Sequence, residues 1–325
     1  MIRLGKLTAV QFALIAAAVT VAHGAPEPLQ ILRQSILSRT NVDFSGVRTV
    51  VVFENGRKMQ GVEQKIDCDA PDNLRIVVLS PQDQRGRLCL TAGPERWEYD
   101  PSTARAVHSV LPSPAQVVQT RLEELNRLAD QMKMQYVGSE SIAGRPAHVV
   151  KVYTAKGLPV KKTWVDTEYY VELKTQRFDS HSKVKSSAYF TRIDYSPSFP
   201  AGHFDFQPPE SATVVQAERD VEHVALEQAE KQAGFDAVLP TYLPPGYRFQ
   251  RDRTGVIEIN GQTTIWLSFS NGADTFSLFE RKASGSSDPA AHDHWITWQD
   301  GGYLFTLMGM LAGDELQRVK ASINP

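Results

Sequence analysis

The sequence lacks every short motif that would mark a common catalytic centre. It has no GxSxG elbow, no HExxH pair, no Walker loop and no dinucleotide-binding glycine pattern. Each of these motifs places a nucleophile, a metal ion or a phosphate at a fixed spacing, so their absence removes the most direct evidence for an enzyme. We therefore expect a binding protein that uses no cofactor and no metal ion.

The chain also carries little net charge and little cysteine. Its 35 lysines and arginines nearly balance 37 aspartates and glutamates, which gives a formal charge of −2. No basic stretch with interleaved aromatic residues occurs, so nothing indicates nucleic-acid binding. The two cysteines, Cys68 and Cys89, do not form a CxxC pair, which argues against a redox or metal-binding role.

Two small groups of polar residues are the remaining candidates for chemistry. Alternate histidines in His292-Asp293-His294 would point to one side of a strand, but no further ligand follows at a recognisable spacing. We interpret this group as a solvated polar loop. Asp166 and Glu168, two residues apart at the head of a strand, are interpreted as a surface turn rather than an acid–base couple.

Long apolar runs are confined to the beginning of the sequence. Arg3 and Lys6 precede the apolar run from Leu7 to Val21, and Ala22-His23-Gly24 supplies small residues for a cleavage site. This pattern predicts a signal peptide over residues 1–24, with an uncleaved membrane anchor as the alternative. The run is shorter than the roughly 20 apolar residues that span a bilayer, which favours cleavage and export. No cysteine lies near the cut, so we expect no lipid anchor.

Export changes the interpretation of the two cysteines. An oxidising compartment permits a disulfide between Cys68 and Cys89. The alternative is two buried thiols on neighbouring strands, because free cysteine packs as a small hydrophobic residue. The sequence leaves both readings open, since it does not give the separation of the two Cα atoms.

Residues 163–209 contain the strongest hairpin signal. The β-rich segments Val171–Phe178 and Val184–Tyr195 flank the polar turn Asp179–Lys183. Both faces of this hairpin carry apolar side chains, which is expected of a sheet covered by helices on one side. The alternation assigns Tyr189, Ile193 and Tyr195 to one face and Val184, Ala188 and Phe190 to the other.

Two stretches have the spacing of amphipathic helices. Pro28–Ser38 has one apolar face. Ser113–Met134 begins with a favourable N-cap, Ser113, and a proline at the first helical position. Its apolar stripe consists of Val117, Val118, Leu122, Leu125 and Leu128. We expect this stripe to pack into the core, as most amphipathic faces do.

The order of several segments resembles the closing half of the LolA-like fold. These segments are Trp164-Val165-Asp166, Tyr170–Lys174, Phe190–Asp194 and Phe204-Asp205-Phe206. That fold is shared by periplasmic lipoprotein carriers and by the RseB/MucB regulators of envelope-stress sigma factors. The helix and strand meander that precede these segments resemble its opening half, so the resemblance covers residues 25–212.

The resemblance implies an α+β fold, with an open antiparallel half-barrel sheet wrapped around helices and an apolar concave face for acyl chains. In such proteins helices cover the mouth of the cavity, so the stripe at residues 113–134 could serve as lid and core together. Most aromatic residues of this half must fill an ordinary core, but we expect some of Phe53, Trp97, Trp164 and Phe190 to line the cavity.

The second half of the chain carries its own resemblance. Three prolines in Leu239-Pro240-Thr241-Tyr242-Leu243-Pro244-Pro245-Gly246-Tyr247 preclude a regular helix. This phrase resembles the start of the small C-terminal domain of RseB/MucB regulators. The polar, helix-prone run Ala217–Gln232 fits either a linker helix or the first helix of a second domain. We expect a linker helix over residues 213–237 and then a small α+β domain over residues 238–325.

Together the two resemblances imply a periplasmic regulator of an envelope-stress sigma factor. Such a protein binds the extracytoplasmic domain of a membrane anti-sigma factor and is released by acyl chains or lipoproteins. The alternative is a lipoprotein or lipid carrier of the LolA type, which would need only residues 25–212. Association into a homodimer is left open.

Overall fold

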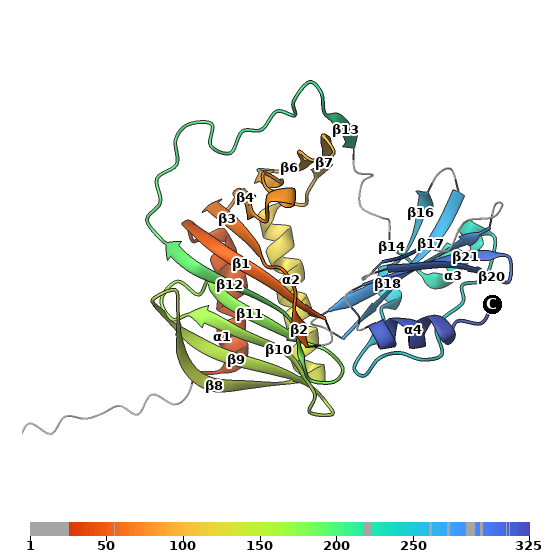
Figure 1. Cartoon of the computed structure of the whole chain (residues 1–325). Coiled ribbons are helices and arrows are strands. Elements are labelled where there is room, and N and C mark those ends of the chain that lie inside the picture. Colours follow the sequence, from red (N-terminus) through yellow and green to blue (C-terminus); the bar gives the residue numbers. More distant parts are fainter. Residues whose placement is uncertain are drawn as a thin grey trace, which may run out of the picture.

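Two sheets, one of 13 strands and one of 8 strands, organise the chain (Figure 1). The structure is a computed structural model that describes residues 26–54, 56–216, 223–259, 262–271, 274–283, 290–292, 295–309, 311 and 313–325. The predicted signal peptide and the side chains of His292-Asp293-His294 lie outside the described residues. Elsewhere in the described part, no three His, Cys, Asp or Glu side chains are grouped to hold a metal ion.

The strands of the large sheet are β1 (Phe44–Glu54), β2 (Arg57–Lys58), β3 (Val62–Asp69), β4 (Asn73–Ser80), β5 (Leu88–Ala92), β6 (Glu95–Asp100), β7 (Arg105–Val110), β8 (Met132–Ile142), β9 (Arg145–Thr154), β10 (Pro159–Asp166), β11 (Glu172–Phe178), β12 (Val184–Asp194) and β13 (Thr213–Gln216). Their order is β13-β7-β6-β5-β4-β3-β1-β12-β11-β10-β9-β8, with β2 paired to β1. Among the strand pairs that the structure describes in this sheet, β13 and β7 alone are parallel. The predicted α+β fold with an open sheet is confirmed, because the two ends of this sheet do not join into a barrel.

The small sheet consists of β14 (His223–Val224), β15 (Arg248–Phe249), β16 (Thr254–Ile259), β17 (Gln262–Ser270), β18 (Thr275–Lys282), β19 (Ala290–His292), β20 (Trp295–Asp300) and β21 (Tyr303–Gly309). Its order is β14-β16-β17-β18-β21-β20-β19, with β15 paired to β17. We call residues 26–216 the large-sheet unit and residues 223–325 the small-sheet unit.

Four α-helices accompany these sheets in the described residues: α1 (Pro28–Leu37), α2 (Pro114–Gln131), α3 (Leu226–Ala233) and α4 (Gly313–Ala321). Short 3-10 turns are η1 (Ser38–Thr40), η2 (Gln82–Gln84) and η3 (Arg251–Arg253). Helices α1 and α2 lie side by side against one face of the large sheet (Figure 1). In the part of the chain that the structure describes, no helix combines the length and the apolar character needed to cross a membrane.

The predicted start of α2 is confirmed by a reciprocal pair of hydrogen bonds. The backbone N–H of Gln116 donates to Ser113 Oγ at 3.3 Å, and Gln116 Oε1 accepts the backbone N–H of Ser113 at 3.0 Å. These bonds provide acceptors for backbone N–H groups that have no intrahelical partner at a helix N-terminus. The helix ends where Met132 turns to an extended conformation and begins β8.

The apolar stripe of α2 is less buried than expected for core packing. Of its five members only Leu125 is buried, at 7% exposure, and the other four are half-buried. By contrast α1 buries Ile31 against Val150 and Val165 of β9 and β10. Helix α2 therefore covers the sheet rather than forming its core, which agrees with the lid alternative.

A β-bulge corrects the predicted faces of the β11–β12 hairpin. Val47 pairs with Arg192 and Arg48 pairs with Phe190, so Thr191 is an extra residue on β12. A bulge shifts the alternation of all later side chains by one position. As a result Phe190 and Ile193 pack in the same cluster, and the predicted separation of these two residues onto opposite faces is wrong.

The connection between the units also differs from the prediction. Residues 213–216 form a strand on the edge of the large sheet, and residues 223–224 form a strand on the edge of the small sheet. Among the described residues of this stretch, the helix runs from Leu226 to Ala233 and ends at Gly234, which has the left-handed backbone that stops a helix. A continuous linker helix over residues 213–237 is therefore wrong, because both flanks find strand partners.

The two cysteines are free thiols. Cys68 on β3 pairs with Leu74 of β4, and Cys89 on β5 pairs with Ile76 of the same strand, so β4 lies between them. Two strand spacings alone separate their Cα atoms by at least about 9–10 Å, beyond the range of about 7 Å that a disulfide spans. Cys68 and Cys89 therefore do not form a disulfide in this structure. Burial raises the pKa of the Cys68 thiol to about 11.

Asp166 is not a surface residue. Its carboxylate is fully buried and accepts hydrogen bonds from Arg145 Nε at 2.9 Å and from the backbone N–H groups of Glu168 and Tyr169. Although burial opposes ionisation, these donors and the charge of Arg145 lower the pKa of Asp166. The predicted turn exists, but the interpretation of Asp166 as exposed is wrong, because Arg145 covers it.

Candidate functional site

A pocket of about 190 Å³ lies between α1, α2 and the large sheet. Its walls come from both helices and from the sheet, in strands β8 to β11. The apolar lining is Leu32, Ile36, Leu125, Leu128, Met132, Met134 and Val152. The polar lining is Ser35, Arg39, Arg121, Glu124, Lys161 and Glu172. An apolar floor with a few converging polar groups is the usual composition of a small-molecule site.

The charges in this pocket are mainly positive. Lys161 Nζ donates to Glu172 Oε2 at 3.0 Å, and the Thr175 hydroxyl donates to the same carboxylate. Desolvation opposes ionisation of Glu172, yet the charge of Lys161 and these hydrogen bonds hold the pKa of Glu172 well below its ordinary value. The lysine charge is therefore already balanced within the pocket.

Two arginines in the lining, Arg39 and Arg121, have no direct ion pair like that of Lys161 in the described part of the chain. Within the described residues, neither Arg39 nor Arg121 forms an ion pair with a carboxylate. Desolvation and the charge of Arg39 lower the pKa of Arg121, whereas the charges of Glu124 and Glu172 act in the opposite direction. An anionic group beside Arg39 and Arg121 would offset their mutual repulsion further, so the pocket suits an apolar chain with a negatively charged head.

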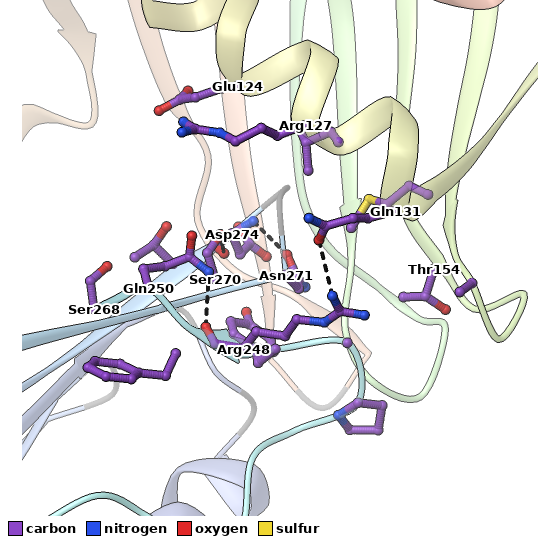
Figure 2. A pocket seen from close by; sticks show the side chains of 18 of the residues that line it. Glu124, Arg127, Gln131, Thr154, Arg248, Gln250, Ser268, Ser270, Asn271 and Asp274 are labelled. Carbon is purple, nitrogen blue, oxygen red and sulfur yellow. Dashed lines mark hydrogen bonds between the residues drawn. The ribbon is translucent and has the colours of Figure 1, made fainter. Parts of the chain in front are cut away.

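A second hollow, a cleft of about 650 Å³, separates the two units (Figure 2). The large-sheet unit contributes the C-terminal half of α2 and the turn between β9 and β10, including Thr154 and Lys156. The small-sheet unit contributes residues 245–250, Arg253 and the end of β17 with the loop that follows it, including Asp274. A cleft of this size falls in the range of typical ligand sites, roughly 300–1,000 Å³.

One set of contacts across the cleft comes from α2. Arg253 forms an ion pair with Glu124, and Arg127 Nη1 lies 3.7 Å from a carboxylate oxygen of Asp252. Arg248 Nη1 donates to Gln131 Oε1 at 3.4 Å, as Figure 2 shows. We call these three pairs the α2 latch. All three lie on successive turns along one side of the helix.

A separate set of contacts comes from the β11–β12 hairpin. The side chain of Asp274 is 3% exposed. Its Oδ1 lies 3.2 Å from Arg177 Nη1, and its carboxylate also forms an ion pair with Lys185. Ser180 Oγ in the hairpin turn donates to Glu315 Oε1 of α4 at 2.9 Å. The small-sheet unit is thus attached to the sheet itself at one place and to the covering helix at another.

The pocket and the cleft share part of their walls. Glu124 and Leu128 of α2, together with Met132 at the start of β8, line both hollows. The face of α2 that carries Arg121 and Leu125 looks into the pocket, and the adjacent face with Arg127 and Gln131 looks into the cleft. A movement of these shared residues at one hollow therefore changes the wall of the other hollow as well.

The residues predicted to line an acyl-chain cavity lie elsewhere. Trp164 and Phe190 come together in one buried cluster of the large sheet, whereas Trp97 stacks with His108 on the distant strands β6 and β7. Phe53 lies half-buried on β1 beside β2. None of the four lines the pocket or the cleft, so their role in ligand binding stays a prediction.

The pocket residues that the prediction missed had a partial signal in the sequence. Leu125 and Leu128 belong to the stripe that marked α2, and Arg121 precedes Leu125 by one helical turn. The stripe therefore pointed to the correct wall. Arg39, Lys161 and Glu172 could not be assigned to this site, because only the folded sheet brings them beside the helices.

Comparisons with known proteins identify the fold. The chain is similar to MucB in the complex structure of Pseudomonas aeruginosa MucA/MucB, with 16% identity over 92% of this chain and 99% of that chain and a TM-score of 0.60. It is similar to MucB in complex with MucA(peri), at 16% identity, the same coverage and a TM-score of 0.58. It is also similar to a crystal structure of MucB, with 15% identity over 93% of this chain and 99% of that chain and a TM-score of 0.55.

These matches extend over both units, so the chain shares the MucB fold as a whole. At such low identity the likeness concerns the fold alone. No protein-family model matches the sequence. No curated protein matches it either.

Proposed function

We propose that this chain is a periplasmic binding protein that regulates an envelope-stress sigma factor by holding the extracytoplasmic domain of a membrane anti-sigma factor. The observation that carries the proposal is the match to MucB over 92% of this chain, in two structures that contain MucA. The match includes the small-sheet unit. A carrier of the LolA type would need only the large-sheet unit, so the presence of the second unit favours the regulator.

The cleft between the units supports binding of a protein segment. Arg248 and Lys156 give it a cationic lining, and Arg248 contacts a neutral partner, Gln131, rather than a carboxylate. The carboxylates of the cleft are engaged: Glu124 with Arg253, and Asp274 with Arg177 and Lys185. Opposite charge across an interface favours association and selects the partner, so a segment with acidic residues fits this cleft.

The pocket beneath α2 supports the second part of the proposal, release by a lipid or lipoprotein signal. Its apolar floor suits an acyl chain, and Arg39 and Arg121 suit an anionic head group. The same pocket also supports the alternative, a lipid or lipoprotein carrier. In either function the chain binds rather than catalyses.

The test is isothermal titration of the purified mature chain with extracytoplasmic domains of anti-sigma factors from the same organism. The regulator predicts saturable binding that weakens when Arg248 and Lys156 are both replaced by glutamine. Native mass spectrometry of the chain purified from the envelope fraction separates the alternatives. A lipid-loaded chain without affinity for any anti-sigma domain would support the carrier and contradict the regulator.

A further inference from the structure

Helix α2 is held to the large sheet by little buried surface. Only Leu125 of its 18 residues is buried, and the described contacts on the side toward α1 include a single side-chain hydrogen bond, from Arg33 Nη2 to Asn126 Oδ1 at 2.9 Å. An element with few buried apolar contacts opens at low free energy compared with the strands it covers. The sheet beneath it is fixed by continuous ladders between β8, β9, β10 and β11. Helix α2 is therefore the wall of the pocket that can move.

The size of the pocket requires such a movement. Its volume of about 190 Å³ is below the roughly 300–1,000 Å³ of sites that enclose a small organic ligand. A long acyl chain fits only if the walls separate. Because the sheet is rigid and α1 is anchored by Ile31 between two strands, separation means that α2 moves away from the sheet.

The opposite side of α2 is where the small-sheet unit holds it. The α2 latch joins Glu124 to Arg253, Arg127 to Asp252 and Gln131 to Arg248. Since Glu124 also lines the pocket, displacement of the helix at this point changes the latch and the cleft at once. The Asp274 contacts with the β11–β12 hairpin do not involve α2, so they keep the two units attached while the cleft changes shape.

We propose that α2 couples the two hollows: an acyl chain that opens the pocket breaks the α2 latch and thereby alters the cleft. This inference rests on the proposed function for its ligand class. Coupling between two sites is reciprocal, so a latch that resists opening must lower the affinity of the pocket for an acyl chain. Weakening the latch from the far side then makes the ligand bind more tightly.

The test compares Arg253→Gln with Arg251→Gln in the full mature chain. Both arginines lie in η3, but Arg253 reaches α2 whereas Arg251 lies 3.9 Å from Glu227 of its own unit. Arg253 lines the cleft and not the pocket. Through direct electrostatics, loss of this positive charge would lower the affinity for an anionic ligand. The proposal predicts the opposite, a higher affinity.

Palmitate, below the concentration at which it aggregates, is the probe, and its affinity is measured by isothermal titration. An ion pair with both side chains more than a third exposed contributes at most modestly, so Arg253→Gln should bind palmitate about two- to five-fold more tightly than the wild type. Arg251→Gln should bind it as the wild type does. Amide hydrogen exchange in α2 should be faster in Arg253→Gln than in Arg251→Gln, which reports the loosened helix without any ligand.

The outcomes distinguish a failure of the acyl-chain ligand class from a failure of the coupling through α2. If the wild type and both variants fail to bind palmitate, the acyl-chain part of the proposed function is wrong and the coupling is overturned with it. If palmitate binds with equal affinity to all three chains and α2 exchanges equally in the two variants, the ligand class stands and the coupling is wrong.

Discussion

Replacing Glu280 with glutamine should remove a pH dependence from the stability of the small-sheet unit. Glu280 lies in the middle of β18 and is fully buried. Its Oε2 accepts the backbone N–H of Val238 at 2.8 Å, whereas Oε1 has no hydrogen-bond partner among the described residues. Burial raises the pKa of this carboxyl from 4.5 to about 8, and the nearby charge of Glu230 acts in the same direction.

The direction and the size of the change in unfolding free energy with pH follow from proton binding to Glu280 in the folded and unfolded states. Between about pH 4.5 and pH 8 the folded chain keeps a proton on Glu280 that the unfolded chain releases. The stability that this proton supplies is fully present below pH 4.5 and is lost as the pH rises through 8. At about 1.4 kcal/mol per pH unit the total loss is on the order of 3–5 kcal/mol.

The assay is urea unfolding of the full chain at several pH values between 4.5 and 8.5, comparing Glu280→Gln with the wild type at each pH. Glutamine stays neutral and keeps an oxygen for Val238, so the two chains should be similar near pH 4.5, and the variant should be more stable at pH 8. Glu258→Gln is the matched control, because Glu258 is exposed and accepts only a hydrogen bond from Thr263. A free-energy difference between Glu280→Gln and wild type that does not change with pH would refute the reasoning.

Three further predictions concern the helix, the contact between units and the thiols. Leu125→Ala removes the one buried side chain of α2 and should lower the local stability of that helix by about 2 kcal/mol, measured by amide hydrogen exchange; unchanged exchange would show that the helix is held by other contacts. Asp274→Asn removes a buried carboxylate that pairs with Lys185 and should destabilise the chain by about 3 kcal/mol in urea, an effect that would be near zero if the contact were solvated. Because Cys68 and Cys89 are free, a reducing agent should leave Tm unchanged, whereas an intact mass two hydrogens short would contradict the structure.

The local signals in the sequence located most of the elements. Ser113 and Pro114 predicted the start of α2, and the capping pair with Gln116 confirms it. The polar turn Asp179–Lys183 predicted the hairpin between β11 and β12. These predictions succeeded because capping and tight turns depend on a few neighbouring residues.

The failures depend on contacts between distant parts of the chain. The bulge at Thr191 arises from pairing with β1, which no local pattern reveals, and it moved Ile193 to the face of Phe190. The predicted linker helix included residues 213–216, but these residues pair with β7 as a parallel strand. The sequence predicts an exposed Asp166 because Arg145, which neutralises it, lies on another strand.

The candidate site shows the same division. The stripe of α2 was visible in the sequence and forms one wall of the pocket, whereas the four predicted aromatic residues lie outside the pocket and their role in ligand binding stays a prediction. Large aromatic side chains such as Trp164 fill the packed core, where they bury the most area. The pocket is lined instead by leucine, methionine and arginine side chains, which only the folded sheet brings together.

The most direct test of the central claim is titration of the mature chain with the extracytoplasmic domain of an anti-sigma factor from the same organism, with and without palmitate. The proposed function predicts saturable binding of the domain, and the coupling through α2 predicts a lower affinity when palmitate is present. Absence of binding to every such domain, by a chain that still binds palmitate, would contradict the regulator and leave a lipid carrier.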